Sequence, residues 1–156
     1  MSFARKTTGR KDTRHAGGNR QGSACVELAV LSPLLVLLLL GIIDGGQFVN
    51  VGQTVSNASR EGARIAAKQT TANVSTVQTA VLNYVTGLYP NLPASAVQVS
   101  VVNAGNPIAG ANIAAVATGT PLSVQVTLQF DQARWIRGLP YLNGRTVTNT
   151  TVSRRE

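Results

Sequence analysis

The sequence predicts an α+β protein with a long N-terminal transmembrane and stalk helix, a second helix and a small antiparallel β-sheet head. Three observations lead to this prediction. Residues 28–43 carry no charge, apolar residues then recur at spacings of three and four as far as residue 65, and beyond residue 96 apolar residues alternate with polar ones. With 156 residues, the chain has room for one small folded domain besides a membrane segment.

The uncharged run of residues 28–43 predicts a helix that crosses a membrane. Its sixteen residues cover about 24 Å as a helix, somewhat less than the roughly 30 Å of hydrocarbon in a bilayer. The span therefore extends into residues 24–26 and 47–51, with Glu27 and Asp44 near the interfaces or in contact with partners. A cleaved secretory signal peptide is the alternative, although this run is longer than a typical signal core and no clear small-x-small cleavage site follows it.

Positive charge is concentrated before Gly22. Six Lys and Arg residues stand there against one Asp, so residues 1–22 carry +5 of the chain's formal charge of +8. Because this composition cannot bury a core, we expect a disordered leader, and its charge places it in the cytoplasm with everything after about residue 50 outside. Nucleic acid is not expected as a partner, because the basic residues are not interleaved with aromatics.

Helical periodicity continues beyond the membrane run, which predicts one helix from about Ala24 to about Lys68. One face carries residues at alternating spacings of three and four: Phe48, Val51, Val55, Ala58, Gly62 and Ile65. The opposite face carries the charged residues Arg60, Glu61, Arg64 and Lys68. Glu61 and Arg64 are three residues apart and can form an ion pair on a solvated surface.

A second helix is predicted after Asn73 or Ser75, either of which can serve as its N-cap. Its apolar face consists of residues Val74, Val77, Val81, Tyr84, Val85 and Leu88. Pro90, in the sequence YPNLP, is expected to end it.

The remainder of the chain has the period of β-strands. Valines alternate with polar residues over 97–101, and Leu, Val and Phe do so over 122–130, so both segments predict half-buried strands. A third strand is expected within 145–153, after the turn signal Asn143-Gly144. The small, turn-rich residues 103–120 form a loop that can hold a short strand. Three strands with one apolar face need a cover, and the apolar faces of the two helices supply it.

No constellation of residues predicts an enzyme. The single histidine, His15, lies in the leader, and the exported carboxylates Glu61, Asp131 and Glu156 are too scattered for an acid/base pair or a metal site. We therefore expect no catalytic residues, no cofactor, no metal and no small-molecule substrate.

A cluster of bulky residues follows the second long strand, and it can be read in two ways. These residues form a partner-binding edge or cap the end of a small core: Arg134, Trp135, Arg137, Leu139 and Tyr141.

The residues around Gly22 form an ordered set: a basic leader, a glycine, Glu27 at the fifth position after it, and then the apolar helix. This set resembles the N-terminus of type IV pilin-like proteins. The resemblance implies that a membrane-embedded prepilin peptidase cuts between Gly22 and Ser23. The new amine of Ser23 would then be a buried cation in an assembly of packed helices, and Glu27 of a neighbouring subunit could neutralise it. The alternative is that Glu27 extends to the interface without a partner.

A more specific resemblance covers residues 22–68. The sequences ELAVLSPLLVLLLLGIIDGGQ and SNASREGARIAAK are similar to the TadE-like family, pseudopilins of the tight-adherence pilus apparatus of bacteria. The matching positions are Glu27, Pro33, Gly41, Asp44, Ala58, Arg60, Glu61, Gly62 and Arg64. Gly41 and Gly45 also form a small-xxx-small pair that could allow close helix packing. Pro33 removes one backbone hydrogen bond and can kink the span, with Ser32 available to compensate.

These resemblances imply a non-enzymatic minor pseudopilin that takes part in assembly of an adhesive, type IVc-like pilus. Its expected partners are the inner membrane, the prepilin peptidase and other pilins and assembly proteins. We expect three parts: the leader 1–22, the transmembrane and stalk helix 23–68, and an exported, pilin-like α+β head 69–156. The alternative is an exported adhesin or protein-binding domain on an uncleaved signal anchor.

Overall fold

The computed structural model describes residues 18–136 and 142–156, with side chains described from residue 22 onward. The expectations for the leader before residue 18, and for Arg137, Leu139 and Tyr141, lie outside these residues. The described part is an α+β fold with a long N-terminal helix, as predicted. Its helices are α1 (Gly18–Ala67), α2 (Val74–Leu88) and α3 (Phe130–Ala133), and its strands are β1 (Val97–Asn103), β2 (Asn106–Pro107), β3 (Pro121–Gln129) and β4 (Thr146–Arg154). Single 3₁₀ turns lie at Ala94–Ala96, Ala109–Ala111 and Ile113–Ala115.

The chain divides into two compact units, Met1–Leu39 and Leu40–Glu156, and we describe each by itself. We call the second the C-terminal unit. It contains the last turns of the apolar run, the rest of α1 and all other elements. The predicted division at residues 22 and 68 separates parts by their expected roles and stays a prediction.

Helix α1 is longer than predicted at its start and ends one residue early. It begins at Gly18 instead of Ala24 and ends at Ala67 instead of Lys68, so the last residues of the leader are helical. Pro33 lies inside it. Since proline has no backbone N–H, the carbonyl of Ala29 loses its donor, and the hydroxyl of Ser32 donates to that same carbonyl at 3.2 Å. This contact is the compensation that the Ser-Pro pair predicted.

The sheet has the strand order β2-β1-β3-β4 and is antiparallel throughout. The predicted alternation is confirmed on β3, where the inward residues Leu122, Val124, Val126 and Leu128 are fully buried. Phe130 was expected to continue this strand but begins the short helix α3 instead. It is nevertheless fully buried, because the turn of α3 still directs it into the core.

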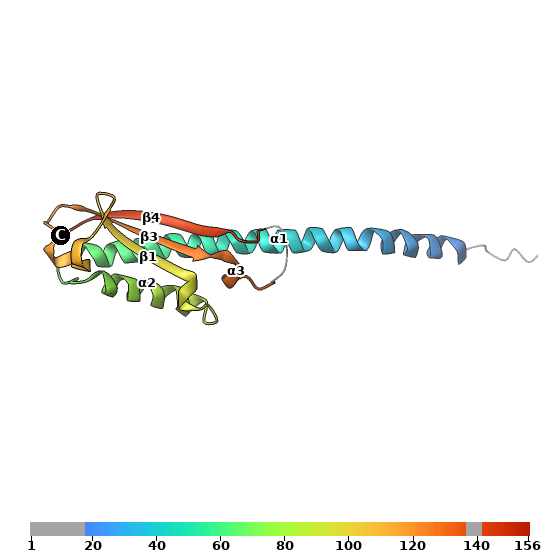
Figure 1. Cartoon of the computed structure of the whole chain (residues 1–156). Helices are drawn as coiled ribbons and strands as arrows, with labels where there is room; N and C mark the ends of the chain where they lie inside the picture. The colour runs from blue at the N-terminus through green and yellow to red at the C-terminus, as the bar shows by residue number, and fades with distance from the viewer. Residues whose placement is uncertain (1–17, 137–141) are drawn as a thin grey trace, which may run out of the picture. The chain divides into compact units, whose positions relative to one another are not determined.

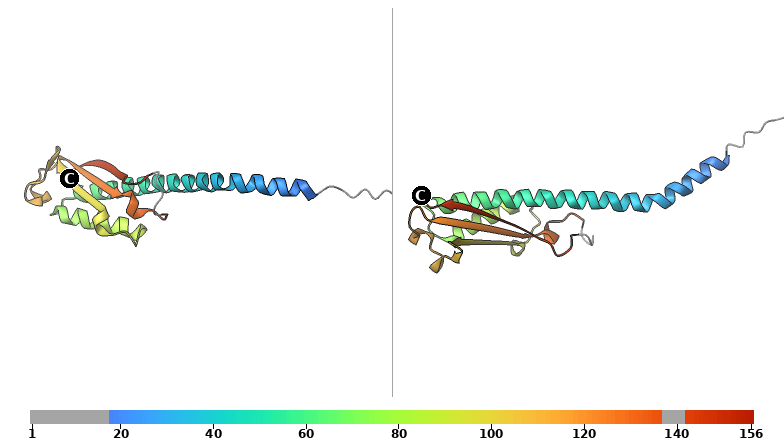
Figure 2. Two further views of the ribbon diagram at one scale, coloured as in Figure 1. Left: turned by 45° about the vertical axis from the view of Figure 1, so that its right-hand side comes forward. Right: turned by 90° about the horizontal axis from the view of Figure 1, so that it is seen from above.

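Helices α1, within the C-terminal unit, and α2 cover one face of the sheet, as Figures 1 and 2 show. Gly62 of α1 lies where the layers are closest. A Cβ atom there would stand 2.7 Å from Cγ2 of Val81 on α2 and 3.0 Å from Cγ1 of Val124 on β3. Any side chain at this position would push the layers apart, so the glycine of the Arg-Glu-Gly segment is required by packing.

Helix α2 begins after Asn73, as predicted, although the Asn73 side chain makes no capping hydrogen bond. The helix ends at Leu88, before Pro90, and the N–H of Tyr89 closes its last turn on the carbonyl of Val85 at 2.9 Å. Its buried stripe is narrower than predicted and consists of Val77, Val81 and Val85. Tyr84 and Leu88 were expected on this face, but they are 37% and 56% exposed. The sheet covers little more than one row of side chains on α2, which leaves the flanking apolar residues in solvent.

The C-terminal end of α1 is capped by Arg155. Its guanidinium is buried and donates to the carbonyls of four residues, Ala66, Lys68, Gln69 and Thr71, at 2.8 to 3.3 Å. The last carbonyls of a helix have no intrahelical donor, and a cation near them is also favoured by the helix dipole. The last residues of the chain therefore hold the end of its first helix in place.

Candidate functional site

The predicted cleavage position lies on an open stretch of helix. Gly22, Ser23 and Glu27 are all exposed, and nothing lies within 4 Å of the position that a Cβ of Gly22 would take. The Ser23 hydroxyl donates to a carboxylate oxygen of Glu27 at 3.2 Å, one helical turn on. The Gly22–Ser23 peptide bond is four residues inside α1, so its backbone is helical in the uncut chain.

The apolar run that follows has an exposed surface in the part of the chain that the structure describes. Most of its large side chains between Val26 and Ile43 are exposed, among them Leu28, Val30, Leu31, Leu34, Leu35, Leu37, Leu38 and Leu39. Within the described residues, α1 is the one helix long and apolar enough to cross a membrane, with a mean hydropathy of 2.6 over its most apolar 18 residues. An uncovered surface of this length and composition requires hydrocarbon or other chains.

Asp44, at the end of the apolar run, forms a buried ion pair with Arg134. Nε of Arg134 lies 3.0 Å from Oδ1 of Asp44, and Nη2 lies 2.6 Å from Oδ2. Both side chains are only 2% exposed. A buried carboxylate is costly unless it is paired, and a guanidinium can satisfy both of its oxygens at once. Asp44 thus obtains the partner that its position required, from a residue ninety positions along the chain.

Aromatic rings hold Arg134 in this position. Its guanidinium carbon lies 5.4 Å from the centroid of the Phe130 ring, which makes an edge-to-face contact with Phe48 at 5.1 Å. Asp131 contributes a second carboxylate, 3.4 Å from Nη1. The short helix α3 therefore supplies the ring and the second carboxylate that surround the guanidinium, and Arg134 follows it directly.

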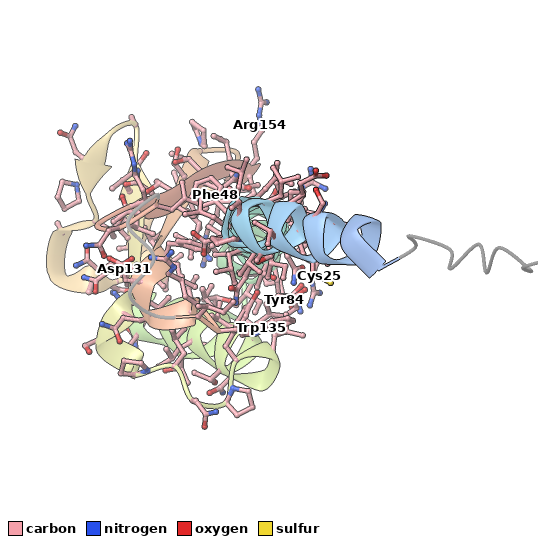
Figure 3. The ribbon with its side chains drawn as sticks, turned by 90° about the vertical axis from the view of Figure 1, so that its right-hand side faces the viewer. Cys25, Phe48, Tyr84, Asp131, Trp135 and Arg154 are labelled. Carbon is pink, nitrogen blue, oxygen red and sulfur yellow. The ribbon has the colours of Figure 1, made fainter. Side chains whose placement is uncertain are left out.

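Gln47, one turn after Asp44, also binds the segment that follows α3. Its amide nitrogen donates to the carbonyl of Ala133 at 2.9 Å, and its amide oxygen accepts from the backbone N–H of Trp135 at 3.1 Å. Together with the ion pair, these bonds fix residues 133–135 against α1. We call the four residues Asp44, Gln47, Arg134 and Trp135 the membrane-exit cluster. Figure 3 shows its Trp135 at the end of the α3 segment.

The glycine pair Gly41 and Gly45 lies on α1 with open space beside it. Both residues are half-buried, and a Cβ at either position would meet nothing within 4 Å. The pair therefore makes no close contact with another described element. Its predicted role in packing between helices remains a prediction.

The charged stripe of α1 is solvated, as predicted. Arg60, Arg64 and Lys68 are exposed, and Arg64 donates to both carboxylate oxygens of Glu61 at 2.9 and 2.6 Å. These hydrogen bonds from Arg64 lower the pKa of Glu61 below its ordinary value, while partial burial opposes the change and the charges of Arg64 and Lys68 assist it. The hydrogen bonds likewise raise the pKa of Arg64. The pair lies on the solvent-exposed side of α1, next in sequence to the buried Gly62.

Metal and cofactor chemistry finds no support in the described residues. No three His, Cys, Asp or Glu residues of residues 18–136 and 142–156 gather where they could hold a metal ion. The cleft beside α3, of about 480 Å³, is lined by residues 88–92 and 132–135, and the one charged side chain among them, Arg134, is already bound to Asp44.

Comparison with known families identifies the N-terminal part of the chain. Residues 22–64 match the family described as TadE-like protein. This segment is TadE-like. The comparison with curated proteins gave no match, and neither did the comparison with solved structures.

The TadE-like segment begins at the predicted cleavage position, contains Glu27 and Asp44, and ends at Arg64. The resemblance predicted from the sequence is therefore confirmed. The match over residues 22–64 and the exposed apolar helix together support a membrane protein with a TadE-like N-terminal segment.

The sequence did not predict that Asp44 pairs with Arg134. Arg134 was expected at a partner-binding edge or at the end of the core, and the structure places it at the end of the core. Asp44 was expected near an interface or with a partner. The available signals were an acidic residue at the end of an apolar run and an arginine beside aromatic residues far along the chain, but neither identifies the other.

Proposed function

We propose that this chain is a membrane-anchored minor pseudopilin of a tight-adherence pilus, cut by a prepilin peptidase between Gly22 and Ser23. Its leader lies in the cytoplasm, α1 holds the chain in the inner membrane, and the C-terminal unit faces the extracytoplasmic side. The observation that carries the proposal is the ordered set of Gly22, Ser23 and Glu27 at the start of an uncovered apolar helix, within a segment that is TadE-like.

The two carboxylates that flank the apolar run differ in a way that supports a role for Glu27. Asp44 is neutralised inside the chain by Arg134. Glu27 has only the Ser23 hydroxyl as a described partner, and no described cation. An acidic side chain near the centre of a membrane span costs about 2.5–3.5 kcal/mol by insertion scales, which is why such residues usually have a partner. A partner from outside the chain is therefore needed once Glu27 enters a helical assembly.

Cleavage would generate that partner. A free α-amine has a pKa of about 7.7–8.0, so the new terminus of Ser23 is mostly a cation at neutral pH. Glu27 of an adjacent subunit can then neutralise it as the helices pack together. Cutting also removes the strongly basic leader, whose repulsion would oppose assembly.

Processing is tested by mass spectrometry of the protein isolated from its native membrane. The expected mature chain begins at Ser23. Gly22→Leu should leave the full-length precursor, because a branched side chain blocks access to the scissile bond. Gly46→Leu is the matched control, since Gly46 is also an exposed glycine of α1 with nothing beside it, and this variant should be cut normally. Normal cutting of the Gly22 variant would remove the peptidase from the proposal.

The pairing role is tested with Glu27→Ala. This variant should still enter the membrane, as measured by resistance to alkaline extraction, but it should assemble poorly. Glu27→Asp keeps the charge on a shorter side chain and should retain part of the assembly. Normal pilus formation with Glu27→Ala would contradict the pairing.

One observation favours a second candidate, an adhesin or binding domain on an uncleaved anchor. The Gly22–Ser23 bond lies inside α1, and a helical peptide must unwind before a protease can cut it. Glycine reduces this cost, because it destabilises a helix by roughly 0.5–1 kcal/mol relative to alanine. If the protein isolated from cells retains its leader, the uncleaved anchor is favoured over the pseudopilin.

A further inference from the structure

Trp135 is a large side chain that the fold leaves uncovered. It is 77% exposed, although its backbone is held firmly between neighbours that are buried or half-buried. Tryptophan combines an apolar ring system with one N–H donor, and in soluble proteins it is mostly covered. The backbone of Trp135 is fixed by a hydrogen bond, whereas its indole ring is exposed. The ring is therefore suited to contact a surface outside the chain.

The position of Trp135 along α1 is set by hydrogen bonds. Its N–H is bound to Gln47, and the preceding Arg134 is bound to Asp44. Gln47 stands four residues beyond Ile43, the last residue of the apolar run, which places it about 6 Å further along the helix axis. The polar interface on each side of a bilayer is roughly 5–7 Å deep beyond the hydrocarbon. When the span is taken from Ala24 to Ile43, which covers about 30 Å, the backbone of Trp135 is anchored at the height of this interface.

Exposed apolar side chains of the C-terminal unit lie close to Gln47 in the sequence and close to Trp135 in space. Ile42 and Ile43 are 63% and 45% exposed on α1, just before the cluster. Leu88, at the end of α2, is also exposed and lines the same cleft as Trp135. The hydrogen bond of Trp135 to Gln47 and its place in the cleft with Leu88 put it beside α1 and the end of α2 within the C-terminal unit.

We propose that Trp135, with Leu88 beside it, contacts the interfacial region of the same bilayer that α1 crosses. Tryptophan is enriched at this depth because its ring lies among the first methylenes while its N–H bonds to water or headgroups. The contact would hold the C-terminal unit against the membrane surface. This inference rests on the proposed function, because it requires α1 to span the membrane.

The composition of the chain allows a direct test, since Trp135 is its single tryptophan. The full chain is reconstituted in vesicles of phosphatidylethanolamine and phosphatidylglycerol, and its fluorescence is measured with lipids brominated either near the headgroup or near the end of the acyl chain. Flotation of the vesicles on a density gradient is measured in parallel. We expect flotation with the vesicles, emission shifted to shorter wavelength than in water, and a larger loss of intensity with the shallow bromines than with the deep ones.

A second reporter position serves as the control. In the Trp135→Phe, Val152→Trp double variant, the indole stands on an exposed position of β4, close to the end of the strand that lies by the C-terminus of α1. Its emission should be that of a solvated indole and should be lost with aqueous iodide instead of brominated lipid.

Three results would overturn the proposed lipid contact. They differ in whether they also overturn the proposed function. Flotation with a solvated Trp135 would leave the proposed function intact and remove the lipid contact. Short-wavelength emission without loss of intensity in brominated lipid would show that protein, such as a second copy of the chain, covers the indole. Absence of flotation would remove the membrane span, and with it both the proposed function and the contact.

Discussion

The two parts of α1 have the same backbone conformation but opposite surroundings. Over residues 22–39, the large apolar side chains are exposed and no described element covers them. Over residues 51–67, one face of the helix is buried against α2 and the sheet, where Val51, Val55 and Ala58 are fully buried. The first part depends on a membrane or on other subunits, whereas the second is stabilised by the chain itself. Five predictions test this difference in the full chain in detergent micelles, the first four by chemical denaturation and the last by thermal unfolding, each followed by near-ultraviolet circular dichroism.

The largest effect is expected where the two parts meet, at the buried ion pair. Asp44→Ala should destabilise the C-terminal unit by about 3–5 kcal/mol, because it removes the carboxylate that binds two nitrogens of the buried Arg134 guanidinium. The double variant Asp44→Leu, Arg134→Met should recover most of the loss, since it removes both charges. A loss below about 1 kcal/mol for Asp44→Ala would mean that the pair does not hold residues 133–135 to α1.

A matched pair of leucines tests the comparison directly. Leu122→Ala should cost about 2–5 kcal/mol, because Leu122 is fully buried on β3 and its removal leaves a cavity. Leu37→Ala removes the same atoms from the uncovered part of α1 and should leave the unfolding free energy within about 0.5 kcal/mol of the unsubstituted chain. Equal losses for the two variants would contradict the difference between the two parts.

The third-largest loss of stability is expected when the Arg155 cap of α1 is removed. Arg155→Met should cost about 1.5–3 kcal/mol, because the carbonyls of the last turn lose a charged donor. Arg154→Met is the control, since Arg154 is exposed and donates to none of these carbonyls, and it should have little effect. If both variants behave alike, the cap does not contribute to stability.

A smaller loss is expected at Gly62. Gly62→Ala should destabilise by about 1–3 kcal/mol despite the better helix propensity of alanine, because its methyl group would overlap Val81. Gly52→Ala on the same helix meets nothing within 4 Å and should be neutral or slightly stabilising. Stabilisation by both substitutions would mean that α2 moves aside at little cost.

The smallest effect is expected for Glu61→Gln. The pKa of Glu61 is lowered in the folded chain, so its contribution to stability is present above the ordinary value of 4.5 and is lost as the pH falls through the lowered pKa. Because the pair is exposed to solvent, the variant should melt only about 1 °C lower at neutral pH. The difference should vanish in acid, and a difference that grew in acid would contradict this sign.

Local periodicity predicted the elements of this fold well. The alternation in residues 122–128 identified β3, the 3-4 spacing over residues 48–65 identified the buried face of α1, and Asn73 and Pro90 bounded α2. These signals lie within a few residues of one another and report which face is buried. These signals were wrong for residues at the edge of a buried face. Leu88 is apolar and in phase, yet exposed, because the width of the covering sheet is not a local property.

The contacts that join distant parts of the chain could not be predicted. Asp44 is separated from Arg134 by ninety residues, and Arg155 reaches the end of α1 across more than eighty. Which arginine pairs with which acceptor depends on the strand order and on where α3 turns the chain. That Asp44 has a partner could nonetheless be predicted, because a carboxylate next to an apolar run needs a cation.

The Ser59 hydroxyl makes one of the polar contacts between α1 and β4. The Ser59 hydroxyl lies within 2.8 to 2.9 Å of three oxygens, those of the Ser56 carbonyl, the Asn149 amide and the Thr151 hydroxyl. Thr151 can donate to Ser59, but Ser59 has one hydrogen and two remaining acceptors. Ser56 and Asn149 are both half-buried, so water can reach the acceptor that the Ser59 hydrogen leaves. Rotation of this hydroxyl therefore exchanges a hydrogen bond within α1 for one to β4.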